Sequence, residues 1–211
     1  VELDPDFAAE LRRNFPPERV TVVQQNVLAF DFAAASAISG HRLSVAGNLP
    51  YYITSQILLK LAASHAALDF AVLMVQREVA DRITAAPGSR DYGLLSVTVQ
   101  IYGPAEQLFT LPPSAFSPPP DVYSTVFRWR FQPRFAELGV DPRGFFPFLR
   151  QAFAQKRKTL QNNLRAAGIE PQTAAAAMSR AAIDPRARAE ALPVESLAAL
   201  WRFLQAPARK L

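Results

Sequence analysis

The chain has 211 residues, 50% of them hydrophobic, with a formal net charge of +5 and no cysteine. This composition is typical of a folded protein with a sizeable core, and it excludes a disulfide scaffold and a thiolate metal site. Two histidines are too few for a typical zinc hydrolase, so we expect no metal. No apolar run is long enough to span a bilayer, and we therefore expect a cytoplasmic monomer without a membrane partner.

The first residues are an unusual start for a natural gene. Val1 stands where a methionine is expected, and it leads directly into an acidic run that ends at Asp6. We therefore interpret the N-terminus as cut or processed.

The charge is unevenly distributed along the chain. Residues 1–139 hold 11 Lys and Arg against 13 Asp and Glu, whereas residues 140–211 hold 12 against 5. A neutral first part and a basic second part are typical of a catalytic domain followed by a domain that binds a polyanion. A well-solvated helical surface gives the same pattern, and charge alone does not decide between the two interpretations.

The first half of the chain alternates strands and helices with short links. Asp4 and Pro5 form a typical helix start, with Asp4 as the N-cap, and this helix is expected to end near Phe15. The other expected elements are strands at 1–3, 20–25, 43–46 and 70–75 and a helix from 54 or 55 to about 64. This order predicts an α/β sheet with parallel strands.

The pattern changes in the second half. Residues 94–102 are compatible with either a strand or a helix, and 106–111 and 123–131 are expected to pair as antiparallel edge strands around a loop with five prolines, Pro112 to Pro120. Beyond about residue 132 only helices are expected, at 145–156, 160–167, 171–181 and 194–205. We therefore divide the chain into residues 1–132 and a small all-helical domain, residues 133–211.

The sharpest motif is the turn Asn48-Leu49-Pro50-Tyr51, directly after a predicted strand. Such a turn at the carboxyl edge of a sheet faces the ligand crevice. Its chemistry suits methylation of an exocyclic amine, because the Asn48 side-chain carbonyl and the Pro50 backbone carbonyl can accept both amine hydrogens. The nitrogen lone pair is then free to attack a sulfonium methyl, while Tyr51 stacks on the flipped base. Taken alone, these four residues are equally well explained as an ordinary turn with a packed aromatic ring.

Three further residues are candidates for the same site. Glu2 ends a predicted strand, where an acid can accept hydrogen bonds from ribose hydroxyls, although a solvent-exposed acid is the simpler interpretation. Asn26 follows the next strand, and it either bonds the edge of an adenine ring or ends the strand. Phe116 lies in the proline-rich loop, where it is suited to be a second stacking wall or a core anchor of the loop.

The second half of the chain contains a group of basic residues that can contact phosphates. For any one of them, a solvated helix end is the more common role. The candidates are Arg150, Lys156, Arg157, Lys158 and Arg165.

Together these motifs resemble the KsgA-type family of ribosomal RNA adenine dimethyltransferases. The combination of the Asn-Leu-Pro-Tyr turn with the proline-framed phenylalanine is highly specific, and the matching segments keep the family order from residue 1 to about 195. These segments are residues 1–4, 45–58, 75–83, 92–97, 111–126, 153–164 and 183–193.

The resemblance implies an enzyme that uses S-adenosylmethionine as its methyl donor and no metal. It implies a Rossmann-like class I methyltransferase domain over residues 1–132 and a helical RNA-binding domain over 133–211, and it makes residues 94–102 a helix. Such enzymes convert two adjacent adenines of small-subunit (16S) ribosomal RNA to N6,N6-dimethyladenosine during ribosome biogenesis. The implied partner is therefore the small ribosomal subunit.

The family's functional residues carry over one by one. Glu2 matches the ribose-binding acid, Asn48 and Tyr51 match the catalytic turn, and Phe116 matches the second aromatic of the adenine pocket. Asn26 stands where the family usually has an Asp that bonds the cofactor adenine. Because an Asn carbonyl can still accept a hydrogen bond there, we expect a lower affinity rather than a lost role.

A larger departure concerns the glycine-rich cofactor loop, which the family has ahead of the position of Val1. None of the eight glycines of this chain forms such a loop. We therefore expect the methyltransferase domain to be incomplete, and this chain alone to bind S-adenosylmethionine poorly and to be weakly active or inactive.

Two alternative functions remain open. The related Erm-type methyltransferases act on large-subunit RNA, although the loop at 114–120 and the segments at 155–164 and 184–190 fit the KsgA type better. A non-catalytic ribosome assembly factor is the second alternative, which the basic second half supports. The intact Asn48, Pro50 and Tyr51 argue against it, because a binding module has no need of them.

Overall fold

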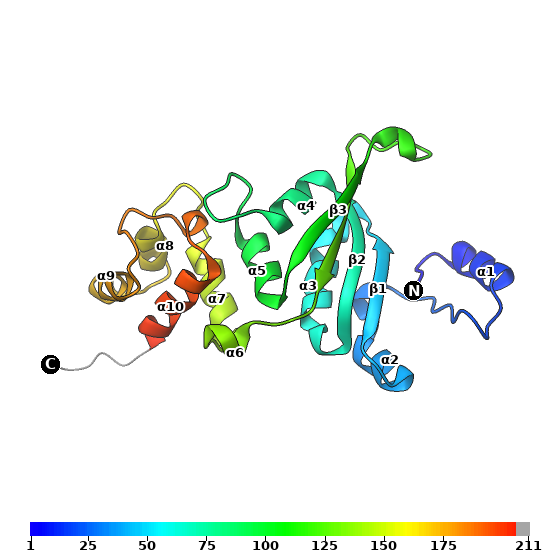
Figure 1. The fold of residues 1–211 in the computed structure, drawn as a ribbon, viewed down its shortest axis with the longest axis horizontal. Helices are drawn as coiled ribbons and strands as arrows, with labels where there is room; N and C mark the ends of the chain where they lie inside the picture. Colours follow the sequence, from blue (N-terminus) through cyan, green and yellow to red (C-terminus); the bar gives the residue numbers. More distant parts are fainter. Residues whose placement is uncertain (206–211) are drawn as a thin grey trace.

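The computed structural model describes residues 1–205, which form a central sheet with a group of helices at one end and a separate helix at the other (Figure 1). The α-helices are α1 (Pro5–Asn14), α2 (Phe32–Ser39), α3 (Thr54–Ala63), α4 (Arg77–Thr84), α5 (Leu94–Tyr102), α6 (Phe135–Leu138), α7 (Pro142–Ala152), α8 (Leu160–Ala166), α9 (Pro171–Arg180) and α10 (Val194–Gln205). The strands are β1 (Leu43–Asn48), β2 (Leu68–Gln76), β3 (Ala105–Leu111) and β4 (Ser124–Arg130). No helix in this part of the chain combines the length and the apolar character needed to cross a bilayer.

Helix α1 begins as the sequence predicts. The Asp4 carboxylate accepts hydrogen bonds from the backbone N–H groups of Asp6 (2.8 Å) and Phe7 (3.2 Å), and Pro5 occupies the first helical position. These contacts satisfy N–H groups that have no partner inside the helix. The helix buries only Ala8, and the Phe7 side chain is 61% exposed, so α1 is weakly packed against the rest of the molecule.

The sheet is mixed rather than parallel. Its strand order is β1-β2-β4-β3, with β1 and β2 parallel and the other two pairs antiparallel. The predicted pairing of the two segments around the proline-rich loop is confirmed. Of these two strands, β3 is at the edge of the sheet as predicted, whereas β4 is not, because it lies between β2 and β3. Within the described residues, the outer edge of β1 has no strand partner.

The strands predicted at 1–3 and 20–25 do not form. Only one isolated parallel bridge joins these segments, from Glu2 to Gln24, with backbone bonds from Glu2 N–H to Val23 O (3.0 Å) and from Gln25 N–H to Glu2 O (2.9 Å). A strand is stable only within a sheet, and this pair has no third strand beside it in residues 1–205. The β-branched residues of these segments were therefore not sufficient to predict a strand.

Three helices, α2, α4 and α6, lie where the sequence analysis predicts no element. Helix α2 is capped by Asp31, which accepts from Ala34 N–H (3.0 Å), and it ends at Gly40 with a φ of 73°. Helix α4 follows β2 directly. By contrast, the ambiguous segment 94–102 is a helix, α5, as the family resemblance implies.

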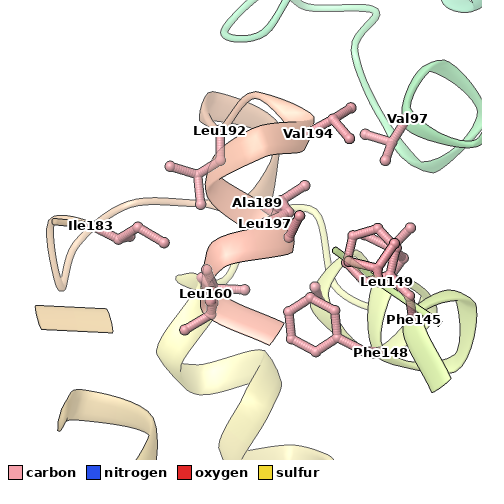
Figure 2. Close-up of a cluster of buried hydrophobic side chains, with 14 of the residues drawn as sticks. Val97, Phe145, Phe148, Leu149, Leu160, Ile183, Ala189, Leu192, Val194 and Leu197 are labelled. Carbon is pink, nitrogen blue, oxygen red and sulfur yellow. The ribbon is translucent and has the colours of Figure 1, made fainter. Parts of the chain in front are cut away.

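The buried apolar side chains form two clusters. One lies between the sheet and α3, and the other lies within the helical group and includes residues of α5 as well as α7, α8 and α10. Figure 2 shows the second cluster, where Val97 faces Val194 and three residues of α7 gather beside Leu197. Because α5 contributes to the helical cluster, the division of the chain at residue 132 stays a prediction.

A loop of residues 85–93 connects the two parts of the molecule. It makes three hydrogen bonds to the helical group: Gly88 N–H to Glu190 O (2.8 Å), Lys156 Nζ to Arg90 O (2.9 Å) and Tyr92 Oη to Leu192 O (3.1 Å). The donors are one backbone N–H, one lysine ammonium and one buried phenol, and a backbone carbonyl accepts each bond.

The buried Tyr92 gives the fold a pH dependence. Burial raises the pKa of this phenol above its ordinary value of 10.0, and the nearby Glu195 carboxylate raises it further. The stabilisation is present in full below pH 10.0 and is lost as the pH rises towards the folded-state pKa, since the unfolded chain ionises first. We expect the free energy of unfolding to fall by about 1.4 kcal/mol per pH unit for this group in that window.

Urea unfolding at two pH values, one below and one above this point, checks the prediction. Tyr92→Phe should lose less stability between the two than the wild-type chain does. Tyr52→Phe is the matched control, because Tyr52 is 83% exposed and should leave the pH dependence unchanged. An equal loss in the wild type and Tyr92→Phe would contradict the assignment.

Candidate functional site

A cleft of about 650 Å³ opens at the carboxyl end of β1. One side is formed by the end of β1 and the turn after it, and the other by the segments around Glu2 and Asn26. Its lining combines apolar and polar side chains and includes Glu2, Asp4, Asn26, Val27, Phe32, Gly47, Asn48, Leu49, Pro50 and Tyr52. The cleft therefore brings together three residues that the sequence analysis assigns to one site: Glu2, Asn26 and Asn48.

The turn after β1 is held by the neighbouring strand. Asn48 pairs with Met74 of β2, and the Leu49 N–H donates to the Met74 carbonyl (3.0 Å). Leu49 is buried, whereas Asn48 is exposed to the cleft. Within the described residues, the Asn48 side chain has no hydrogen-bond partner. Its amide is thus fixed in position by the sheet and remains available to a ligand.

The Pro50 carbonyl is already occupied. It accepts hydrogen bonds from the Ile53 N–H (3.2 Å) and from the Thr54 hydroxyl (3.1 Å), and these bonds start the helix α3. The Leu49 carbonyl accepts no hydrogen bond from residues 1–205 and belongs to a residue that lines the cleft. As a second acceptor beside Asn48, Leu49 is therefore better suited than Pro50, and sequence spacing alone did not distinguish the two.

Tyr51 lies at the boundary between this turn and β4. Its hydroxyl is 2.6 Å from the Ser124 hydroxyl, and Ser124 is buried at the start of β4. This bond fixes the end of the half-buried phenol ring. Ser124 was not a predicted site residue, and only its family segment, 111–126, hinted at a role.

Glu2 and Asn26 reach the cleft with part of their hydrogen-bonding capacity used. One Glu2 carboxylate oxygen accepts from the N–H groups of Leu3 (2.7 Å) and Asp4 (2.9 Å), which fixes the orientation of the side chain. The Asn26 carbonyl oxygen accepts from the Leu28 N–H (2.9 Å). The second Glu2 oxygen and the Asn26 amide N–H groups remain for a ligand.

Phe116 does not join this site. Its N–H donates to the Pro113 carbonyl (3.1 Å), and the residue is half-buried at the end of a short turn in the proline-rich loop. It does not line the cleft, and no ring contact with Tyr51 is present among the described residues. Its assignment as the second wall of an adenine pocket stays a prediction.

The predicted basic residues are all exposed, and three of them form one tract. Lys156, Arg157 and Lys158 occupy the turn between α7 and α8, around a shallow concavity of about 520 Å³. Arg150 and Arg165 lie in the last turns of α7 and α8. Helix α7 ends four residues earlier than predicted, at Ala152, because the buried Asn163 amide donates to the Ala152 (2.7 Å) and Gln155 (3.3 Å) carbonyls.

Comparison with known proteins gives a single family. The family described as "Ribosomal RNA adenine dimethylase" matches residues 1–206. The chain is 58% identical over 206 residues to the ribosomal RNA small subunit methyltransferase A of Acidobacterium capsulatum, covering 97% of this chain and 72% of the relative. It is 46% identical to the protein of the same name from Koribacter versatilis, covering 97% and 76%.

Two solved structures share the fold at low sequence identity. A dimethyladenosine transferase from Plasmodium falciparum superposes with a TM-score of 0.73 at 19% identity, over 94% of this chain and 78% of that one. The 23S rRNA methyltransferase ErmE superposes with a TM-score of 0.69 at 21% identity, over 97% and 80%. The chain thus has a Rossmann-like methyltransferase sheet with an added helical part.

Proposed function

Because the chain belongs to the ribosomal RNA adenine dimethylase family, we propose that it transfers methyl groups from S-adenosylmethionine to the exocyclic amine of adenine in small-subunit ribosomal RNA. We include in this proposal the product N6,N6-dimethyladenosine at two adjacent positions, and the cytoplasmic, monomeric state expected from the sequence. The observation that carries it is the free amide of Asn48, held by β2 at the mouth of the cleft.

The cleft fits the adenosine half of the methyl donor. The free Glu2 oxygen suits the ribose hydroxyls, the Asn26 amide suits a ring nitrogen, and Val27 and Phe32 provide apolar walls. Only one glycine, Gly47, lines the cleft, so few close backbone contacts are available to the methionine half. When bound, the donor supplies an electrophilic methyl group on a sulfonium.

Asn48 and Leu49 then act on the target amine. An adenine amino nitrogen is a weak nucleophile because its lone pair is delocalised into the ring. We assign the Asn48 side-chain oxygen and the Leu49 carbonyl as the two acceptors of its hydrogens, in place of the Pro50 carbonyl. Holding both hydrogens favours a tetrahedral nitrogen whose lone pair is directed at the methyl group.

Tyr51 positions the base. A flipped adenine presents a flat face that a phenol ring can cover, and unstacking costs a few kcal/mol, roughly what one or two such contacts recover. The hydrogen bond between the Tyr51 and Ser124 hydroxyls keeps the ring from rotating away. We propose that Phe116 covers the other face when RNA is bound.

The helical part is proposed to bind the RNA. We propose that residues 133–211 form the RNA-binding domain and 1–132 the catalytic domain, with Lys156, Arg157 and Lys158 as the central phosphate contacts and Arg150 and Arg165 beside them. The exposure of all five supports this, since phosphate contacts need cations at the surface, although the Lys156 ammonium also donates to the Arg90 carbonyl.

Methyl transfer from labelled S-adenosylmethionine to unmethylated ribosomal subunits tests the proposal. We expect label on small subunits, released as dimethyladenosine on nucleoside analysis, at high donor concentration because the cleft makes few contacts to the methionine half. Label on large subunits instead would assign the Erm-type activity. Binding to small subunits without any label would favour the assembly factor.

A further inference from the structure

A second cleft lies beside the catalytic turn. It has a volume of about 430 Å³ and is formed by the end of β2, the first turns of α4, the 85–93 loop and the end of the proline-rich loop. Its lining residues are Gln76, Arg77, Glu78, Asp81, Asp91, Asp121, Val122 and Tyr123. We refer to it as the Tyr123 cleft.

The Tyr123 cleft is connected to the catalytic turn through short contacts. Gln76 at the end of β2 pairs with Ser124, and the Arg77 N–H donates to the Tyr123 carbonyl (2.9 Å). Ser124 in turn bonds the Tyr51 hydroxyl at 2.6 Å. The cleft and the turn therefore share one edge of the sheet, with Tyr51 and Ser124 between them.

An aromatic ring is available in this cleft. Tyr123 is 45% exposed, and the Arg77 guanidinium lies 4.9 Å from the centre of its ring. Tyrosine rings and guanidinium planes are both flat surfaces of the kind on which nucleobases stack.

The carboxylates of the cleft are of two kinds. Glu78 pairs with Arg82, and Asp81 accepts a hydrogen bond from Gln107 Nε2 (3.0 Å). Asp91 and Asp121, from two different loops, make no side-chain hydrogen bond or ion pair with other described residues and are exposed. Free carboxylates repel phosphate and accept hydrogen bonds from amino groups, which excludes the RNA backbone and favours an amine-bearing base.

We propose that the Tyr123 cleft binds the base of a nucleotide next to the target adenine. This base stacks on Tyr123, and Asp91 or Asp121 accepts hydrogen bonds from its exocyclic amine, so that adenine and cytosine are preferred over uracil. The inference rests on the proposed function, because it takes RNA as the substrate and the turn at Asn48 as the site of the target base. Tyr123 and Arg77 are then residues that determine which base is preferred next to the target adenine.

The experiment measures dissociation constants, so it does not depend on methyl transfer. The probes are five-nucleotide RNAs with one central adenine, in which each neighbour in turn is adenine, uracil or abasic. We expect removal of one neighbouring base to weaken binding to the wild-type chain by about 10-fold, the size of one base–aromatic stack. The same removal should leave binding to Tyr123→Ala unchanged, and Tyr123→Phe should behave as wild type.

Three further results test the proposal. Phe109→Ala removes another exposed aromatic ring, outside the cleft, and should retain the full effect of the abasic neighbour. Asp121→Asn combined with Asp91→Asn should reduce the preference for adenine over uracil. The proposal is overturned if removal of either neighbouring base weakens binding equally in the wild-type chain and in Tyr123→Ala. Methyl transfer that depends on Asn48 is measured separately, and its presence would leave the proposed function supported even then.

Discussion

Asn48→Ala is expected to lower the rate of methyl transfer by about 10³-fold while binding of small subunits stays within about two-fold of wild type. Removing one group that stabilises developing charge typically costs on the order of 10²–10³ in rate, and Asn48 also orients the amine. Its side chain has no described protein partner and is exposed, so the substitution removes no contact of the fold.

Asn14→Ala provides the control for this variant. Asn14 is the exposed last residue of α1 and lies outside the cleft, so its loss should change neither rate nor binding. The measurement is a single-turnover rate at saturating donor, alongside a binding assay on the same subunits. If subunit binding fell in parallel with the rate, Asn48 would be assigned to docking rather than to catalysis.

Replacing Lys156, Arg157 and Lys158 together with alanine should weaken RNA binding on the order of 10²-fold at low salt. Each lost phosphate contact also removes released counterions, so the slope of log K against log salt should become shallower by about 2 to 3. We expect the rate of methyl transfer at saturating RNA to fall much less than the affinity, since all three residues are proposed to contact phosphate and only Lys156 also bonds the 85–93 loop.

A variant with the same change in net charge separates a local contact from a general electrostatic effect. Arg12, Arg13 and Arg19 are exposed and lie far along the chain from the basic tract. Their replacement by alanine should lower affinity only slightly and leave the salt slope near that of wild type. An equal loss in both triple variants would mean that overall charge, not the tract, attracts RNA.

Local signals made several elements predictable. The start of α1 was predicted correctly because its cap is made within four residues, by Asp4 and its own first turn. The pairing of β3 with β4 was also correct, since a stiff proline-rich loop joins two segments of strand length. The predictions that failed concern elements that depend on tertiary contacts. The segments around Glu2 and Gln24 have strand-like sequences but make only one bridge.

The residues that line the cleft were predictable to a similar degree, while their roles stay predictions. Asn48 could be recognised because a strand and a turn determine where it points, and both are local. Which carbonyl is free beside it depends on how α3 begins, and the sequence does not show that Thr54 takes the Pro50 carbonyl. The position of Phe116 depends on how its loop packs, and a residue pattern carries no information about that.

The three hydrogen bonds of the 85–93 loop fix the spacing between the basic tract and the catalytic turn. Lys156, which belongs to the tract, itself donates to the Arg90 carbonyl of this loop, so the proposed RNA-binding part is bonded directly to the loop that leads to the sheet. A molecule built in this way is expected to select its target by distance along the substrate. With the phosphate contacts proposed for the tract, this spacing limits how far along the RNA the two target adenines can lie from the bound phosphates, and one nucleotide inserted between them should lower methyl transfer to both adenines.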